Sequence, residues 1–103
     1  MSPLARSKAI LEGDGWYVEK VEHWNAFARK RQDLFGFLDL LCLKSGQVMG
    51  VQVTTRNHLS DRYKKILLSP LLSMVLDSGI VIYIHGWGKL KNGWDCKIVQ
   101  VTE

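Results

Sequence analysis

The residues best suited to chemistry lie in residues 34–55, where polar side chains interrupt two apolar runs. Asp39 interrupts the first run, and Gln52 and Thr54 interrupt the second. A polar group in a buried strand is costly unless it has a partner or a function. A carboxylate beside an amide oxygen can hold a hard cation such as Mg²⁺ or Mn²⁺, with water and a backbone carbonyl as further ligands. Asp39 and Gln52 are therefore candidate metal ligands.

The two runs predict a β-hairpin with strands over residues 34–43 and 47–55. If its turn centres on Ser45 and Gly46, Asp39 and Gln52 are directly opposite each other on one face, with their Cβ atoms about 5 Å apart. Two simpler interpretations stay open. The Asp39 carboxylate could accept a hydrogen bond from the Gln52 amide, or it could form a structural ion pair with a nearby Arg or Lys.

Further elements must position this hairpin. Ser2 and Pro3 favour a helix that begins there and ends near Gly13. Residues 16–24 alternate and predict one partly exposed strand, from which Glu22 could face the site. Residues 25–32 are polar and predict a loop.

The second half of the chain predicts a helix followed by two strands. Asn57 is a candidate cap for a helix over residues 57–68, with its buried stripe at Leu59, Tyr63, Ile66 and Leu67. A further helical turn follows Ser69-Pro70. Residues 80–85 form a continuous β-branched run, which predicts a buried strand parallel to its neighbour. A turn is expected at residues 86–88 and an edge strand over residues 94–101, so the fold class is α/β.

Basic side chains gather near the predicted site. Lys30 and Arg31 directly precede the first strand of the hairpin, and Arg56 follows the second strand. His58, Arg62 and Lys65 are spaced i, i+4 and i+7 and would form one stripe on the helix. Such residues either face solvent or contact phosphate, and the sequence leaves both interpretations open.

Composition indicates one domain over residues 1–103. The chain is 47% hydrophobic and 23% charged, with a net charge of +4, which admits an anionic partner. Its two cysteines show no metal-ligand spacing, and we expect a reducing compartment, the cytoplasm. We expect no membrane association, because no apolar run approaches the roughly 20 residues that span a bilayer.

At this point the sequence resembles the PD-(D/E)XK nuclease core, in particular its phage-type and Holliday-junction-resolvase-like members. Gly36-Phe37-Leu38-Asp39 is similar to the family's Gly-x-x-Asp element, and Gln52-Val53-Thr54 to its (Glu/Gln)-x-Lys element. The resemblance covers roughly residues 4–86. It implies an αβββαβ core with a mixed central sheet flanked by helices, here followed by a C-terminal edge strand. It also implies a bacterial or phage origin.

The resemblance implies metal-dependent hydrolysis of a DNA phosphodiester, on structured or branched DNA. Asp39, Gln52 and the backbone carbonyl of Val53 would hold Mg²⁺ or Mn²⁺, with Asp33 as a further candidate ligand. The basic residues would bind the DNA backbone: Lys30, Arg31, Arg56, His58, Arg62 and Lys65. The family's lysine position is Thr54 here, which supplies no positive charge. Arg56 and Lys65 are candidates for that role, and we favour Lys65 because an ammonium acts as a compact charge.

Two other functions remain open. The chain could be a DNA-binding module with the nuclease fold and no activity, or an unrelated α/β interaction domain in which Asp39 is structural. A single small domain has no separate recognition unit, so specificity would come from DNA shape or from a homodimer.

Overall fold

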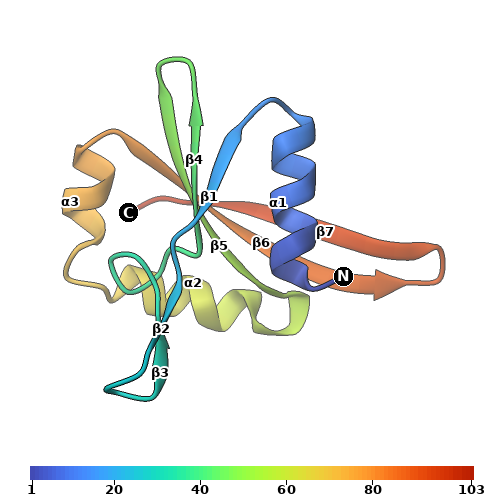
Figure 1. Cartoon of the computed structure of the whole chain (residues 1–103), viewed down its shortest axis with the longest axis horizontal. Coiled ribbons are helices and arrows are strands. Elements are labelled where there is room, and N and C mark those ends of the chain that lie inside the picture. Colours follow the sequence, from blue (N-terminus) through green and yellow to red (C-terminus); the bar gives the residue numbers. More distant parts are fainter.

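A computed structural model describes all 103 residues, which form a mixed five-stranded β-sheet with helices on both faces (Figure 1). The sheet has the strand order β1-β4-β5-β6-β7, in which β5 and β6 are parallel and the other neighbours antiparallel. The predicted α/β class is therefore correct. The elements are α1 (Pro3–Gly13), β1 (Tyr17–Lys20), β2 (His23–Asn25), β3 (Lys30–Gln32), β4 (Leu40–Lys44), β5 (Gln47–Thr55), the 3₁₀ helix η1 (Arg56–His58), α2 (Leu59–Leu67), α3 (Leu72–Asp77), β6 (Ile80–Leu90) and β7 (Gly93–Val101).

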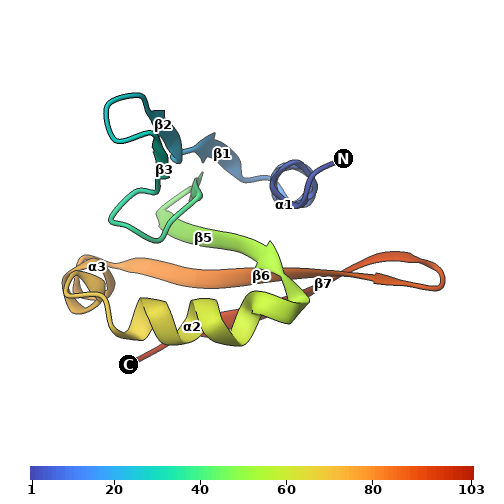
Figure 2. The ribbon, with the colours of Figure 1, turned by 90° about the horizontal axis from the view of Figure 1, so that it is seen from below.

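The helices lie in two layers. Helix α1 covers one face of the sheet, and α2 and α3 cover the other (Figure 2). Each face has its own apolar core. Leu11 and Val51 belong to the core under α1, and Ile66 and Ile84 to the core under α2 and α3. None of the helices is long and apolar enough to cross a membrane.

The predicted hairpin register is confirmed. Strands β4 and β5 pair Lys44 with Gln47 and Leu40 with Val51 around a turn in which Gly46 has a φ of +75°. The pairing stops at Leu40, and the register shifts at Asp39, because its backbone N–H also donates, at 2.9 Å, to the carbonyl of Val51, the residue that Leu40 opposes. The chain then crosses over through α2 and α3, and β6 returns parallel to β5, as predicted.

The first strand of the hairpin is shorter than predicted, because residues 34–38 form a turn. Phe35 and Gly36 have φ values of +57° and +85°, which a strand does not accommodate. The N–H of Leu34 donates to the carbonyl of Leu38 at 3.0 Å and closes the turn. Leu38 is fully buried, and its side chain occupies the space where a side chain at Gly50 would lie. Gly36, which the sequence prediction placed within a strand, therefore lies in a turn.

The single strand predicted over residues 16–24 is wrong, because it divides into β1 and β2. Strand β1 ends at Lys20, which pairs with Leu40 at the beginning of β4. Because β4 begins at Leu40, the residues after Lys20 have no residue of β4 to pair with. Strand β2 pairs instead with β3, inside the segment predicted to be a loop, and the two form a separate sheet.

Two further boundaries differ from the sequence prediction. Asn57 lies within η1 and does not cap α2, whose N-cap His58 makes no side-chain capping hydrogen bond. Leu67, predicted to be buried, is 45% exposed. The turn expected at residues 86–88 is absent, because β6 continues to Leu90 and pairs with β7 throughout.

A buried polar network fastens α1 to β6. The predicted Ser2 cap is confirmed, since its hydroxyl accepts from the N–H of Ala5. Farther along the helix, the Ser7 hydroxyl accepts from the indole N–H of Trp87 at 2.8 Å and lies 2.9 Å from Nδ1 of His85. Burial lowers the pKa of His85 to about 4, so the imidazole is neutral and its Nδ1 can accept from Ser7.

Candidate functional site

Asp39 and Gln52 lie side by side on the face covered by α2. Oδ2 of Asp39 accepts two hydrogen bonds, from Nε2 of Gln52 at 2.7 Å and from the backbone N–H of Val53 at 2.8 Å. Both side chains are buried, with exposed fractions of 4% and 5%. The hydrogen bond is the simpler alternative that the sequence left open. It turns the amide nitrogen of Gln52, and not its oxygen, towards the carboxyl.

Two more acids complete a cluster around Asp39. One oxygen from each of Glu22, Asp33 and Asp39 lies within 4.8 Å of the others. Glu22 follows the end of β1, and Asp33 follows the end of β3. Asp33 was predicted as a further candidate ligand, and Glu22 only as a residue that could face the site. The break between β1 and β2, which places Glu22, has no clear sequence signal.

The surroundings of Asp39 disfavour its ionised form. Burial raises the pKa of Asp39 to about 8, Asp33 adds repulsion, and the N–H of Val53 opposes the shift. Burial also raises the pKa of Asp33, and a hydrogen bond with Asp39 and the charges of Arg62 and Arg31 partly offset this rise. Glu22 has its own partner, since it accepts from Nη1 of Arg31 at 2.8 Å. No Lys or Arg side chain forms an ion pair with Asp39 itself, so a bound cation would stabilise its ionised form.

This donor set fits a hard divalent cation. Carboxylate oxygens are the ligands that Mg²⁺ and Mn²⁺ prefer, and the ligands of octahedral Mg²⁺ lie about 3–4 Å apart. The three oxygens of the cluster lie within 4.8 Å of one another, so small side-chain movements would bring them to these separations. The N–H groups of Gln52 and Val53 both donate to Oδ2 of Asp39, which leaves Oδ1 without an N–H donor and available as a ligand.

The backbone of Val53 contributes at the same edge of the sheet. In a β-strand the N–H and the C=O of one residue point to the same neighbouring strand. The N–H of Val53 points to Asp39, and Val53 lines the cavity beside the acids. Its carbonyl therefore faces this edge, as the predicted ligand role requires.

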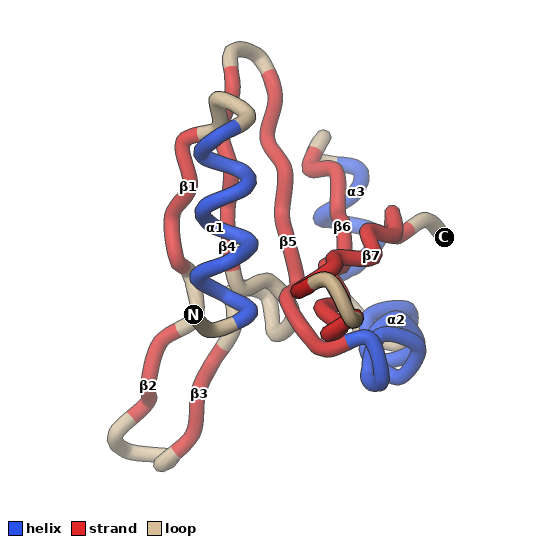
Figure 3. Tube along the Cα trace, turned by 90° about the vertical axis from the view of Figure 1, so that its right-hand side faces the viewer, coloured by secondary structure: helices blue, strands red, loops and turns tan.

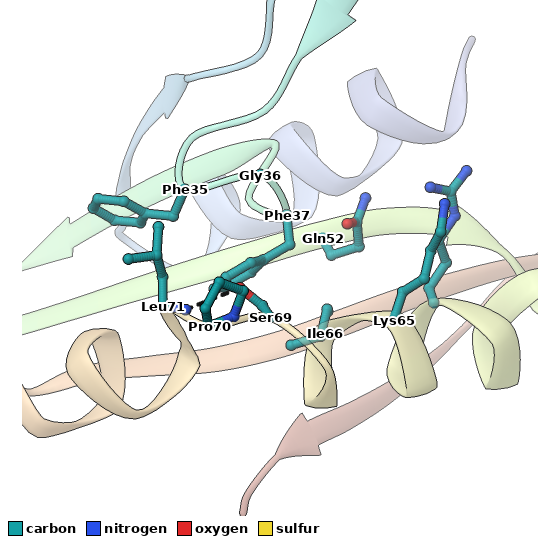
Figure 4. A pocket seen from close by; sticks show the side chains of 10 residues that line it. Phe35, Gly36, Phe37, Gln52, Lys65, Ile66, Ser69, Pro70 and Leu71 are labelled. Atoms are coloured by element: carbon teal, nitrogen blue, oxygen red, sulfur yellow. Dashed lines mark hydrogen bonds between the residues drawn. The ribbon is translucent and has the colours of Figure 1, made fainter.

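Two adjoining cavities meet at Gln52 and Arg62. The first, of about 270 Å³, is lined by the three acids, Gln52, Val53, Arg31 and Arg62. The second, of about 360 Å³, lies between α2 and the turn at residues 34–38. Figure 4 shows Lys65 at one end of this second cavity, Phe35 and Leu71 at the other, and Phe37 and Gln52 between them. Of these two compartments, the acids therefore line only the first, Arg62 lines both, and Lys65 lines only the second.

The structure separates the predicted cations into two groups. Arg31, Arg62 and Lys65 line the two cavities described above. Lys30 lines a third cavity, of about 560 Å³, which Asp33 also lines. Arg56 lies elsewhere, because its guanidinium pairs with Asp95 of β7 at 2.5 Å. Arg56 is therefore not available to replace the family's lysine.

Thr54 and His58 do not join the cavities. Thr54 is buried on the same face as Gln52 but lines neither compartment. His58 is exposed in η1 and is also absent from both linings. Of the cations considered for the lysine role, Lys65 shares a cavity with Gln52.

Comparisons with protein-family models, with curated proteins and with solved structures found no match to this chain.

Proposed function

We propose that this chain is a metal-dependent nuclease that hydrolyses a phosphodiester bond of DNA. The observation that carries the proposal is the cluster of Glu22, Asp33 and Asp39 next to a cavity lined by Arg62 and Lys65. Phosphoryl transfer needs oxygen ligands for a divalent cation and fixed positive charge for the phosphate. Here the two requirements are met in adjoining compartments.

The order of elements supports the same proposal. Without the β2–β3 hairpin and the short α3, the chain runs α1, β1, β4, β5, α2, β6, which is the αβββαβ order of the restriction-endonuclease-like core. The acids follow β1 and precede β4, and Gln52 lies on β5. These are the positions at which the resemblance to PD-(D/E)XK nucleases expects the site.

Each residue of the site has a separate task. Asp39, Asp33, Glu22 and the carbonyl of Val53 would hold Mg²⁺ or Mn²⁺. When bound, this ion supplies Lewis-acid polarisation of the phosphate and lowers the pKa of an attacking water. Gln52 orients Asp39 through its amide N–H.

The cations act on the phosphate. Arg62 lines both compartments and can bind a phosphate oxygen while it faces the acids. Lys65 reaches the same cavity and can stabilise the negative charge that grows in the transition state. We assign to Lys65 the task that Thr54 cannot perform.

A DNA-binding module without activity is the second candidate function. The hydrogen bonds from Gln52 and Val53 favour it, because they satisfy one oxygen of Asp39 without any metal. Both candidates predict DNA binding that weakens as salt rises, since the cations displace counterions from the phosphates. Only the first predicts cleavage.

A nicking assay on supercoiled, linear and branched DNA, with Mg²⁺ and with Mn²⁺, tests the proposal. We expect the wild type to nick DNA only with a divalent ion, and Asp39→Ala to abolish nicking while DNA binding persists. Asp77→Ala is the matched control, because this acid is exposed at the end of α3, away from the cluster. DNA binding without nicking under every condition would leave the second candidate. No salt-dependent binding at all would refute both.

A further inference from the structure

The β2–β3 hairpin stands apart from the rest of the molecule. Its two strands pair only with each other, and they project away from the five-stranded sheet (Figures 1 and 3). Its tip is ordered by its own hydrogen bonds, since Oδ1 of Asn25 accepts from the N–H groups of Phe27 and Ala28, both at 3.0 Å. The hairpin is therefore a defined projection.

Two large aromatic side chains on this projection face solvent. Phe27 at the tip is fully exposed, and Trp24 of β2 is 61% exposed. Burial of an aromatic side chain contributes about 1.5–3 kcal/mol to folding, and this hairpin forgoes it at both positions. Exposed apolar groups gathered on one projection are typical of a binding surface.

The charge around these aromatic residues identifies the partner's chemistry. Residues 23–32 include Arg29, Lys30 and Arg31 and no acidic residue. The partner should therefore be anionic and should also present flat apolar surfaces. Nucleic acid has both properties, because its phosphates are negative and its bases stack on aromatic rings.

The hairpin also begins and ends at the acid cluster. Glu22 directly precedes β2, and Asp33 directly follows β3. Trp24 pairs with Arg31 across the hairpin, two residues from each of these acids. At a rise of about 3.3 Å per residue, the Trp24–Arg31 pair lies about 7 Å along the hairpin from the cluster. A base stacked on Trp24 would thus belong to a nucleotide close to the phosphate at the site.

Bases inside a duplex cannot stack on these aromatic rings, because neighbouring base pairs cover their faces. A base at a branch point or in a single strand offers free faces to a protein ring, whereas a blunt end offers only the outer face of its last base pair. The two exposed rings therefore favour a substrate in which at least one strand is unpaired near the site.

We propose that Trp24 and Phe27 stack on unpaired bases, so that the substrate is DNA with an unpaired strand adjoining the cleaved linkage. This inference rests on the proposed function, and it assigns the projecting hairpin to substrate selection. Arg29 and Lys30 bind the backbone of the unpaired strand, while the acid cluster lies at the base of the hairpin.

Fluorescence anisotropy in EDTA tests the inference without cleavage. The probes are a blunt DNA duplex and the same duplex with a short unpaired arm. We expect the wild type to prefer the armed duplex, and Trp24→Ala and Phe27→Ala each to weaken binding to it about tenfold while binding to the blunt duplex changes little. Trp24→Phe keeps an aromatic face and should keep most of the affinity. Met74→Ala, at an exposed apolar position of α3, is the matched control.

The outcomes separate this inference from the proposed nuclease activity. If the wild type nicks DNA with Mg²⁺ but both alanine variants keep its preference for the arm, the inference is wrong and the nuclease activity stands. The inference is also wrong if the wild type shows no preference for the arm. Loss of the preference in the variants, in a protein that never nicks DNA, would support the hairpin's role and refute the hydrolysis.

Discussion

Replacement of Asp39 by asparagine should stabilise the metal-free protein at neutral pH. The pKa of this carboxyl is raised from 3.8 to about 8 in the folded protein, chiefly by burial. Between these values the folded state binds more protons at this carboxyl than the unfolded state does. The contribution of Asp39 to the free energy of unfolding is therefore greatest below pH 4 and falls as the pH rises towards 8. Asparagine has nearly the same shape, does not ionise, and can still accept from the N–H of Val53.

The size of the effect follows from the shift and from the cavity beside Asp39. A shift to about 8 corresponds to about 6 kcal/mol, at about 1.4 kcal/mol for each pKa unit. A domain of this size is stabilised by only about 5–15 kcal/mol in total, and water in the adjoining cavity screens the charge. We therefore expect Asp39→Asn to gain about 2 kcal/mol on the wild type between pH 5 and pH 8.

Urea unfolding of both proteins across this pH range, in EDTA, measures the difference. All other ionisable groups are common to the two proteins, so most of their contributions cancel. Addition of Mg²⁺ provides the second half of the test. At ten times its dissociation constant, the ion should stabilise the wild type by about 1.4 kcal/mol and leave Asp39→Asn unchanged.

Two results would refute this reasoning. Parallel pH profiles for the two proteins would mean that Asp39 ionises normally and that burial does not govern its pKa. An equal response of both proteins to Mg²⁺ would mean that the ion binds elsewhere. Either result would remove the physical basis of the proposed metal site.

Three further predictions concern catalysis and packing. Lys65→Ala should slow nicking about 100-fold without weakening Mg²⁺ binding by calorimetry, because the lysine acts on the phosphate and not on the ion. Gly50→Ala should cost about 1–3 kcal/mol in urea unfolding, since its Cβ would lie 2.5 Å from Cδ1 of Leu38, whereas Gly13→Ala meets nothing within 4 Å and should cost nothing. Ser7→Ala should cost about 1–3 kcal/mol by the same measurement, because it leaves a buried indole N–H on β6 without an acceptor. A urea midpoint equal to that of the wild type would contradict this.

The sequence predicted the central hairpin well, because that prediction rested on a short turn and on strict alternation. Once the turn is fixed at Ser45 and Gly46, the pairing follows residue by residue as far as Leu40 and Val51. Asp39 lies just beyond this paired segment and meets Gln52 through a side-chain hydrogen bond. The parallel strand β6 was also predictable, since a continuous β-branched run after a helix is typical of a strand that is buried on both faces and reached by a crossover.

The rest of the site depends on contacts that leave little trace in the sequence. Whether residues 16–24 form one strand or two depends on where β4 begins, and that depends on the turn at Phe35 and Gly36. An apolar run hides this turn, because Phe37 and Leu38 are buried in it as they would be in a strand. Glu22 was therefore predicted only as a residue that could face the site, although its carboxylate belongs to the cluster.

The β2–β3 hairpin is joined to the molecule only at its two ends, next to Glu22 and Asp33. Its tip can therefore be lengthened, shortened or exchanged while the carboxylates keep their positions, because exposed hairpin tips tolerate such changes. The molecule thus combines a replaceable hairpin tip with a fixed cluster of acids. A graft at residues 26–29 would be the natural place to re-engineer what the protein recognises.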